Sequence, residues 1–478
     1  MVTRRSFLLG AGAGLATFGL GAGTGAFLTA DGGWRRGADL PRAETVGASG
    51  SLPVQADVVV VGAGIAGLST AHALRDRGLS VVVLEKGVVA GEQSSRAFGW
   101  IYSAGWHPDK LELANRSKTL WADFARANER DIGYRRTGNL SLLESEEAVE
   151  GQRAWLAEAK ERAPDMDVRL VSGAELERLT PGAGKAYQAA LYSPSDGIAE
   201  PTIAAPRIAR ALQAKGVPVI QRCAVRSVET EGGAIRHVVT EQGVVRTSNV
   251  VVAGGAWSRL FLGNLGMPFP QLGIASPLMR VTRAQGPDGA GYAPDFTWRR
   301  QIDGNYVVGA LRNVAPVTRA SFAELLNFLP TLRHASGLVT MRFGQDFFES
   351  LRMPTHWSSD EVTPFERNRF LSAKPYQDEL DRRFEALREA FPDFRASAPI
   401  ESWGGVIDAT PDSTPIISAV DRLPGLSLIS GFSGNGLTVG PAAGEMMAQI
   451  IAGETPTVDP AIYRYDRFFD GSDLTFRH

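Results

Sequence analysis

A run of β-branched residues at 57–61, Asp-Val-Val-Val-Val, leads into Gly62-Ala63-Gly64-Ile65-Ala66-Gly67 and then into a helical pattern. This order of strand, glycine-rich turn and helix is typical of a dinucleotide-binding βαβ unit. Gly62 permits the tight turn, Gly64 lets a pyrophosphate approach the backbone, and Gly67 allows the helix to pack closely on the strand. The helix N-terminus offers free N–H groups and a positive dipole end to the phosphates.

The residues that follow supply the other half of this unit. Residues 80–84, Ser-Val-Val-Val-Leu, read as a second parallel strand, and Glu85 at its end lies 18 residues after Gly67. An acid at that place accepts hydrogen bonds from ribose hydroxyls. The glycines alone also fit a strand–turn–helix that binds no ligand, and the strand, helix and acid together favour dinucleotide binding.

The length, composition and net charge of the chain narrow the class of protein. A chain of 478 residues is too long for one ordinary domain, and 44% apolar residues indicate a globular protein. The formal net charge of −2 gives no basic footprint for nucleic acid. Cys223 is the only cysteine, and the six histidines show no ligand spacing. We therefore expect no disulfide, no metal and no nucleic-acid partner.

The N-terminus predicts export. Arg4-Arg5 precede Phe7-Leu8-Leu9 and an uncharged Gly/Ala-rich run to Ala30, which is similar to a twin-arginine signal. Seven glycines between positions 10 and 25 make a membrane-spanning helix a poorer interpretation. We expect residues 1–30 to be the signal, residues 31–55 to be a linker, and the protein to be periplasmic or extracytoplasmic. An uncleaved signal would keep it at the membrane.

The second informative stretch lies near the end of the chain. Gly431-Phe-Ser-Gly-Asn-Gly-Leu-Thr-Val-Gly-Pro441 is a glycine-dense loop that leads into a helix from Ala442. Such a loop again presents backbone donors and a positive dipole end, and it suits a ring oxygen that gains charge on reduction. Upstream stand Trp403-Gly404-Gly405 and Thr410-Pro411-Asp412.

Together with the Ser94-Ser95 loop, the Ser195-Asp196-Gly197 turn and the strand at 250–257, these motifs resemble the flavin-dependent D-amino-acid oxidase, glycine oxidase and sarcosine oxidase superfamily. The resemblance runs from about residue 57 to the end of the helix that begins at Ala442. It implies FAD as cofactor. The residues implied to bind FAD are Gly62, Ala63, Gly64, Ile65, Gly67, Glu85, Lys86, Ser94, Ser95, Arg96, Val225, Gly254, Gly434, Asn435, Gly436 and Leu437.

The buried strand pattern returns at 249–253, about 190 residues after the first strand, so another domain is inserted between elements of one sheet. We expect an α/β protein (α+β overall) in which a Rossmann-like FAD-binding domain carries an inserted antiparallel-sheet substrate domain. The FAD-binding domain is assigned residues 56–130, 190–270 and 401–478, and the substrate domain residues 131–189 and 271–400.

The resemblance implies an enzyme that takes a hydride from the carbon beside an amine, after which the imine hydrolyses. Its substrate would be a small amine or amino acid: a D-amino acid, an N-methyl compound or a cyclic imino acid. The flavin carries the chemistry, so no side-chain base is required and no catalytic residue is assigned. Two other interpretations stay open: a flavoprotein acting on a hydroxy acid, and an FAD-bearing subunit of a multi-subunit dehydrogenase.

Two departures from the family pattern affect the substrate and the electron acceptor. Amino-acid oxidases usually carry an arginine after the Trp-x-Gly stretch, but residues 406–408 here are Val-Ile-Asp. The remaining candidates for the substrate site are Arg280, Arg300, Arg312 and His107, each of which also fits a solvated surface position. No lysine occurs between Lys215 and Lys374, which favours a quinone or a redox protein over oxygen as the electron acceptor.

Overall fold

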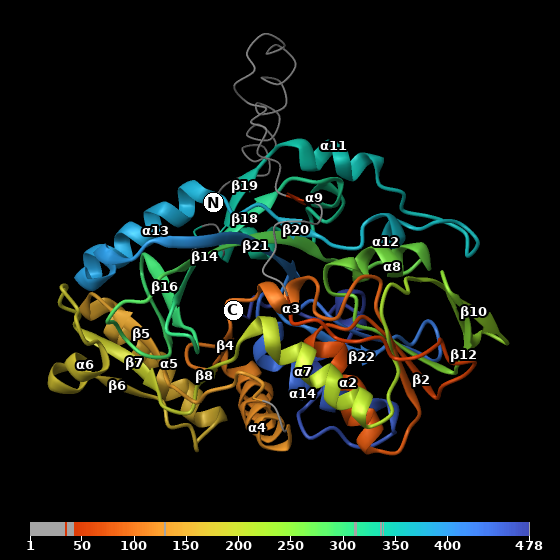
Figure 1. The fold of residues 1–478 in the computed structure, drawn as a ribbon, viewed down its shortest axis with the longest axis horizontal. Helices are drawn as coiled ribbons and strands as arrows, with labels where there is room; N and C mark the ends of the chain where they lie inside the picture. Colours follow the sequence, from red (N-terminus) through yellow and green to blue (C-terminus); the bar gives the residue numbers. More distant parts are fainter. Residues whose placement is uncertain are drawn as a thin grey trace, which may run out of the picture.

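Two sheets organise the molecule (Figure 1). The computed structural model describes residues 34–35, 43–128, 131–309, 313–334, 337 and 339–477. Within these residues a six-stranded sheet with helices on its faces adjoins a larger twelve-stranded sheet. The predicted α/β class, with a Rossmann-like unit joined to a second sheet, is confirmed.

The six-stranded sheet contains the first motif. Its strand order is β22-β23-β13-β2-β3-β9, and all neighbours are parallel except the edge strand β22. The strands are β2 (Val58–Val61), β3 (Val81–Leu84), β9 (Val219–Ile220), β13 (Asn249–Val252), β22 (Ile416–Ala419) and β23 (Leu426–Ser430). A parallel sheet covered on both faces buries every side chain, which explains the runs of valine.

Two helices that follow strands of this sheet pack against each other. α2 (Ile65–Asp76) begins after β2, and α14 (Gly436–Ile451) begins after β23. At their contact a Cβ on Gly444 would lie 2.5 Å from the Thr70 nitrogen and 2.7 Å from the Ser69 Cβ. The two helices therefore approach so closely that only glycine fits at position 444. Helices α4 (Leu111–Ala127) and α7 (Pro201–Ala214) complete this side.

The twelve-stranded sheet is built around β14 (Leu272–Val281), which pairs antiparallel with β21 (Pro399–Ala409) and β17 (Tyr306–Gly309). Its other strands are β1 (Trp34–Arg35), β5 (Asn139–Leu143), β6 (Arg169–Val171), β7 (Ala189–Ser193), β15 (Ala290–Ala293), β16 (Phe296–Arg300), β18 (Asn313–Pro316), β19 (Val339–Arg342) and β20 (Ser372–Ala373). Helix α13 (Gln377–Ala390) covers one face through Leu380, Phe384 and Leu387.

The smaller elements surround these sheets. They are α3 (Gln93–Arg96), α5 (Glu146–Arg162), α6 (Gly173–Leu179), α8 (Ser258–Asn264), α9 (Arg319–Ala323), α10 (Leu329–His334), α11 (Gln345–Arg352), α12 (Pro364–Arg367), the two-stranded β4 (Trp100–Ile101) and β8 (Gly197–Ile198), and the three-stranded β10 (Val225–Glu231), β11 (Ala234–Thr240) and β12 (Gly243–Arg246). The hairpin predicted through residues 231–233 is the β10–β11 pair.

The sheets place several segments differently from the expected domain boundaries. β7 and β21 belong to the large sheet, so the expected boundaries at 190 and 401 fall close to or inside its strands. That sheet is also mixed, because β15 pairs parallel with β5 and β18 pairs parallel with β19. Part of the expected linker is packed: residues 34–35 form β1, and Glu44 forms ion pairs with Arg207 and Arg210.

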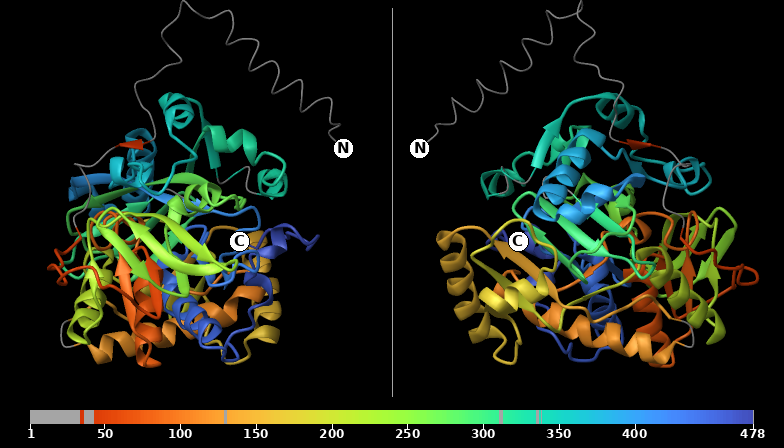
Figure 2. Two further views of the ribbon diagram at one scale, coloured as in Figure 1. Left: turned by 90° about the vertical axis from the view of Figure 1, so that its right-hand side faces the viewer. Right: turned by 60° about the vertical axis from the view of Figure 1, so that its left-hand side comes forward.

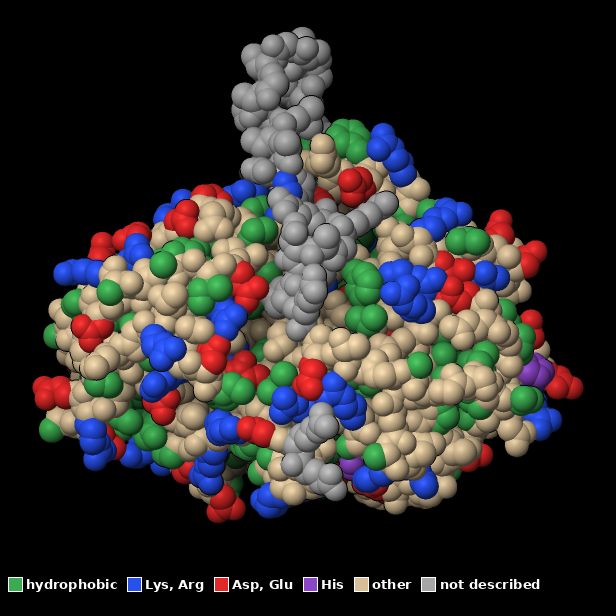
Figure 3. Space-filling view, viewed as in Figure 1, with side chains coloured by type: hydrophobic (Ala, Val, Ile, Leu, Met, Phe, Trp, Pro, Cys, Tyr) green, Lys and Arg blue, Asp and Glu red, His purple; other side chains and the backbone are tan. Residues whose placement is uncertain are grey.

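Among the described residues on the face shown in Figure 3, acidic and basic side chains are interspersed. Among the described helices, none combines the length and the apolarity that crossing a bilayer requires. Figure 2 shows β1 at the end of the molecule that also carries α9, β19 and α11.

The contact of α14 with α2 yields a stability prediction. Gly444→Ala will lower the free energy of unfolding by about 1–3 kcal/mol, because the added methyl group overlaps the α2 backbone. Gly263→Ala in α8 is the matched control, since nothing lies within 4 Å of the added Cβ. There the better helix propensity of alanine will raise stability by about 0.5–1 kcal/mol. Urea unfolding of both variants measures this, and equal midpoints would contradict the close packing.

Candidate active site

A cavity of about 680 Å³ lies between the two sheets. The carboxyl ends of four parallel strands open into it, through Gly62 after β2, Glu85 after β3, Gly254 after β13 and Ile429 of β23. Ligands of open α/β sheets bind at this edge. The first residues of both α2 and α14 also line the cavity, so two helix N-termini face the same space.

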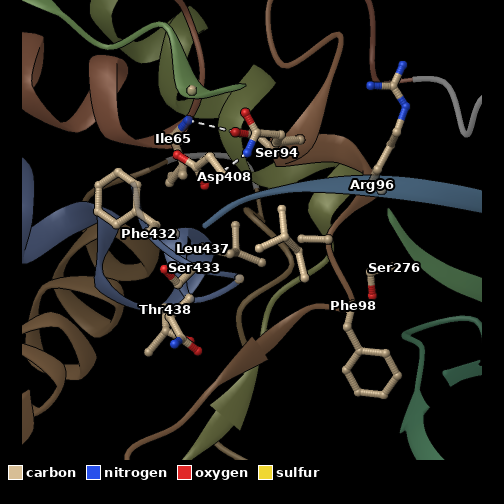
Figure 4. Close-up of a pocket in the computed structure, with 18 of the residues that line it drawn as sticks. Ile65, Ser94, Arg96, Phe98, Ser276, Asp408, Phe432, Ser433, Leu437 and Thr438 are labelled. Carbon is tan, nitrogen blue, oxygen red and sulfur yellow. Dashed lines mark hydrogen bonds between the residues drawn. The ribbon is translucent and has the colours of Figure 1, made fainter. Parts of the chain in front are cut away.

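The glycine motif is held in place in the wall of the cavity. Gly62 has φ of +114°, which glycine adopts without strain. The Glu85 carboxylate accepts hydrogen bonds from the Ala63 nitrogen at 2.9 Å and the Gly87 nitrogen at 2.8 Å. Burial raises the pKa of Glu85. Ser94 Oγ accepts a hydrogen bond from the Ile65 nitrogen at 2.9 Å (Figure 4). These hydrogen bonds fix the glycine turn and the first residues of α2 where they line the cavity.

The loop before α14 forms another part of the cavity wall. Ser433 and Gly434 have φ of +51° and +96°, which turns the chain so that Asn435 becomes the N-cap. No side chain caps this helix end. The first-turn N–H groups of a helix have no intrahelical partner. Gly436 and Leu437 line the cavity at this point, and the loop offers donors to an electron-rich ligand.

Buried polar atoms test whether the cavity fits a cofactor. Among the described residues, Arg96 Nε and Nη2 and Trp100 Nε1 are buried, line the cavity and have no hydrogen-bond partner. Burial lowers the pKa of Arg96 to about 10, so the guanidinium stays charged at neutral pH. Unpaired buried donors need a ligand to satisfy them. Two helix N-termini that face the same cavity, with these unpaired donors in its wall, fit an anionic dinucleotide such as FAD.

Most of the residues expected to bind FAD line this cavity; the exceptions are Ala63, Gly67 and Ser95. These three support the site from behind. Ala63 donates to Glu85, and a Cβ on Gly67 would overlap the Gly62 carbonyl oxygen. Ser95 Oγ donates to the Glu92 carbonyl oxygen at 3.2 Å.

Lys86 lines the cavity, but its ammonium group is already bound. Its Nζ lies 2.9 Å from the Glu92 carboxylate and donates to the carbonyl oxygens of Asn368 and Arg369. The family resemblance implies that Lys86 lies beside the adenosine ribose, and that contact stays a prediction.

The expected substrate residues are mostly elsewhere. Arg280 is paired with Asp303 and Glu401, and Arg300 lies 3.5 Å from Asp288 on the surface. His107 caps the 3₁₀ turn at 108–110 by accepting from the Asp109 nitrogen at 3.3 Å. None of the three lines the cavity, so the structure does not bring them to the candidate site. Arg312 lies outside the described residues.

A further part of the cavity wall is aromatic. The side chains are those of Phe98, Trp100, Tyr102, Trp106 and Tyr292. Their ring centroids form a chain of contacts: 4.5 Å from Phe98 to Trp100, 5.0 Å from Trp100 to Tyr102 and 5.4 Å from Tyr102 to Trp106. Leu142 and Leu143 of β5 extend the apolar surface. Our sequence reasoning missed this wall, because no motif marks it.

A buried ion pair supports the aromatic wall from outside the cavity. Arg299 of β16 lies 2.9 Å from Glu200, and both side chains are buried. Arg299 also fills the space beside Gly99, whose φ is +104° and whose Cβ would lie 2.6 Å from Arg299 Nε. The backbone that carries Phe98 and Trp100 is thus fixed by a contact from the second sheet.

Comparison with known proteins assigns the family. Residues 57–450 match the family model described as FAD dependent oxidoreductase. The structure of L-amino acid deaminase from Proteus myxofaciens, determined with anthranilate, is 38% identical, with a TM-score of 0.89, over 92% of this chain and 99% of that chain. L-amino acid deaminase from Proteus vulgaris is 36% identical, with a TM-score of 0.85, over 89% and 100%. Glycine oxidase from Pseudomonas aeruginosa is 26% identical over 85% and 97%.

The chain therefore belongs to the FAD-dependent oxidoreductase family and is an enzyme. FAD as cofactor, predicted from the two glycine-rich loops, is confirmed. The prediction of an oxidoreductase of amino acids or amines is confirmed as a class. The individual FAD contacts remain predictions, now with a cavity that contains most of them.

Proposed function

We propose that this enzyme oxidatively deaminates an L-amino acid with a large apolar side chain. The observation that carries the proposal is the aromatic wall of Phe98, Trp100, Tyr102, Trp106 and Tyr292 beside the two FAD loops. A wall of stacked rings binds a large apolar group better than it binds glycine or sarcosine. The similarity to L-amino acid deaminases, one of them holding an aromatic amino-carboxylate, supports the L configuration.

Bound FAD would accept the hydride from the carbon that bears the amine. The protein's part is orientation: the aromatic wall places the side chain and limits water around the reacting carbon. With a neutral substrate amine no side-chain base is needed. The imine released would hydrolyse to a 2-oxo acid and ammonia.

A cation for the substrate carboxylate is best sought at Arg312. Its described neighbours in sequence, Gly309 and Asn313, both line the cavity, and Asn313 Oδ1 is buried without a partner. Arg280, Arg300 and His107 are turned to other partners or to the surface. An arginine binds a carboxylate through two parallel hydrogen bonds. We therefore propose Arg312 for this role.

We further propose a slow reaction with oxygen and a quinone or redox protein as acceptor. Lys86 is the one lysine among the described residues that line the cavity, and Glu92 and two carbonyl oxygens occupy its ammonium group. A lysine held in this way is a poor source of positive charge for reduced oxygen.

Export through the twin-arginine route and contact with a membrane complete the proposal. The support for export is Arg4-Arg5 with the uncharged run to Ala30. For membrane contact, the segment 319–352 exposes large apolar side chains: Phe322, Leu326, Met341, Phe348 and Leu351. β1, the first described strand, lies at this same end of the molecule (Figure 2). Together, the N-terminus and this apolar segment would hold the enzyme against lipid.

The substrate proposal is tested by anaerobic mixing with a panel of amino acids. L-phenylalanine and L-leucine will bleach the flavin absorbance, whereas D-phenylalanine, glycine, sarcosine and glycolate will be at least tenfold slower. Admitting air afterwards will restore the colour slowly and with little peroxide. Fast bleaching by glycolate or by D-amino acids would contradict the proposal. No bleaching by any compound would favour an FAD-bearing subunit of a larger complex.

The carboxylate proposal is tested with Arg312→Lys and the matched control Arg300→Lys. Loss of the two-point hydrogen bond, worth about 1.5–3 kcal/mol, will lower kcat/KM roughly 10- to 150-fold at position 312. The effect will appear mainly in KM, and FAD content will not change. Arg300 is a surface residue paired with Asp288, so its variant will match the parent. Steady-state kinetics measure both, and equal values for the two variants would exclude Arg312.

Export is tested by Arg4→Lys with Arg5→Lys in the full chain. The enzyme will then stay in the cytoplasm with FAD bound, while the parent will fractionate with the periplasm or the membrane. Unchanged export of the double lysine variant would refute the twin-arginine assignment.

Membrane contact is tested by Phe348→Ser with Leu351→Ser on α11. This variant will move exported protein from the membrane to the soluble fraction.

A further inference from the structure

Asp408 occupies an unusual position in the cavity. It lies on β21, lines the cavity and is 2% exposed (Figure 4). Its Oδ2 accepts from the Gly431 nitrogen at 2.8 Å, and its Oδ1 accepts from Gln93 Nε2 at 3.1 Å. Among the described residues no cation lies within ion-pair distance of it. A buried carboxylate without a cation is costly, so its hydrogen bonds matter more than usual.

Gln93 extends this contact to a second loop. Its Oε1 accepts from the Ala256 nitrogen at 2.9 Å, while its Nε2 donates to Asp408. The amide therefore has one correct orientation, with the oxygen toward Ala256 and the nitrogen toward Asp408. A Cβ on Gly255 would overlap the Gln93 Oε1, which shows how tightly the amide fits.

Ser430 adds a further contact between Asp408 and the segment that contains Gly255. Its hydroxyl lies 3.4 Å from Asp408 Oδ2 and 3.1 Å from the Gly255 carbonyl oxygen, and it accepts from Gln271 Nε2 at 3.2 Å. The Asp408 carbonyl oxygen also accepts from the Ser433 nitrogen at 3.2 Å. The carboxylate thus contacts the segments 91–96 and 430–436 directly and reaches the segment 253–256 through Gln93, and all three segments contribute residues to the cavity wall.

We propose that Asp408 is a positioning residue that fixes these three loops around the flavin and, by its negative charge, keeps the reduction potential of the flavin low. The first part follows from the ring of hydrogen bonds. The second follows from electrostatics, because a buried negative charge opposes the negative charge that the flavin gains on reduction. A low potential favours electron transfer to an acceptor downstream. The inference depends on FAD binding and not on the proposed substrate.

The charge is present under working conditions. Burial raises the pKa of Asp408 to about 6, and the hydrogen bond from the Gly431 nitrogen opposes part of that rise. The carboxylate is therefore mostly ionised in neutral to mildly alkaline buffer, where the potential and the FAD affinity are to be measured.

Asp408→Asn is the first variant. The single side-chain oxygen of asparagine can accept a hydrogen bond from either the Gly431 nitrogen or Gln93 Nε2. The amide NH2 group then faces the other of these two donors, which is unfavourable. We expect FAD to dissociate at least tenfold more readily. We also expect the equilibrium between oxidised and reduced flavin to shift at least tenfold toward reduction, which is about 30 mV for a two-electron couple. Asp421→Asn, an exposed acid, controls for loss of one charge and will behave as the parent.

A swapped pair separates hydrogen bonding from charge. In Asp408→Asn with Gln93→Glu, the new amide at position 408 would donate to the new carboxylate at position 93, which also accepts from Ala256. The amide oxygen at position 408 still accepts from Gly431. All partners are satisfied and one negative charge stays in the cavity, so FAD affinity and potential will both return close to those of the parent. Gln93→Glu alone places two carboxylates together and will weaken FAD binding.

FAD release is followed by flavin fluorescence on dilution of the holoenzyme, and the potential by equilibrium with a reference dye, both without substrate. FAD release and a reduction potential equal to those of the parent in Asp408→Asn would overturn the proposal.

A swapped pair that releases FAD as readily as Asp408→Asn would overturn the positioning role. If Asp408→Asn yields no folded protein, Gln93→Glu decides: unchanged FAD binding would overturn the proposal. Failure of every amino acid to reduce the flavin would leave these results standing.

Discussion

The close contact of α14 with α2 determines where this protein can bind a ligand. Gly444 leaves room for the α2 backbone at Ser69 and Thr70, so the two helices lie against each other. Each follows the carboxyl end of a parallel strand, and their N-termini consequently reach one cavity. Two positive helix ends about 370 residues apart in sequence then act on the same ligand. In FAD the pyrophosphate is negative and the isoalloxazine ring gains negative charge on reduction, so one dinucleotide provides a partner for each helix end.

Much of this arrangement could be predicted from local sequence, since it depends on backbone. Gly62, Gly64 and Gly67 are required by a turn with positive φ and by close packing, and these requirements are visible in a short pattern. The runs of valine at 58–61 and 249–252 identify buried parallel strands for the same reason. The glycines at 431–440 likewise indicate a loop that leads into a helix, although α14 begins at Gly436 and not at the expected Ala442. Domain boundaries were less accessible, because β7 and β21 continue the large sheet where the chain has no composition change.

The substrate wall depends on side-chain register and could not be predicted from the sequence. Tyr292 reaches the cavity because β15 pairs with β5 and β16, and a shift of one residue would turn it away. Phe98 and Trp100 are placed by Gly99, which makes room for Arg299 from the other sheet. The residue type made Arg280 and Arg300 candidates for binding the substrate carboxylate. In the structure each of them pairs with an acidic side chain at the surface instead. A charged residue in the sequence indicates which ligand group it could bind. Only the three-dimensional structure shows whether another side chain of the protein already pairs with it.

The balance of charge inside the cavity links binding to redox chemistry. Two helix N-termini and the Arg96 guanidinium favour negative charge on a ligand, and these alone would stabilise a reduced flavin strongly. The Asp408 carboxylate acts in the opposite direction, and Glu92 neutralises Lys86 before it can contribute. A site that binds the cofactor tightly need not make it a strong oxidant, because affinity depends on the phosphates and potential depends on the ring. Asp408 links the two properties, because its hydrogen bonds hold the segments that line the cofactor cavity while its charge opposes reduction of the ring.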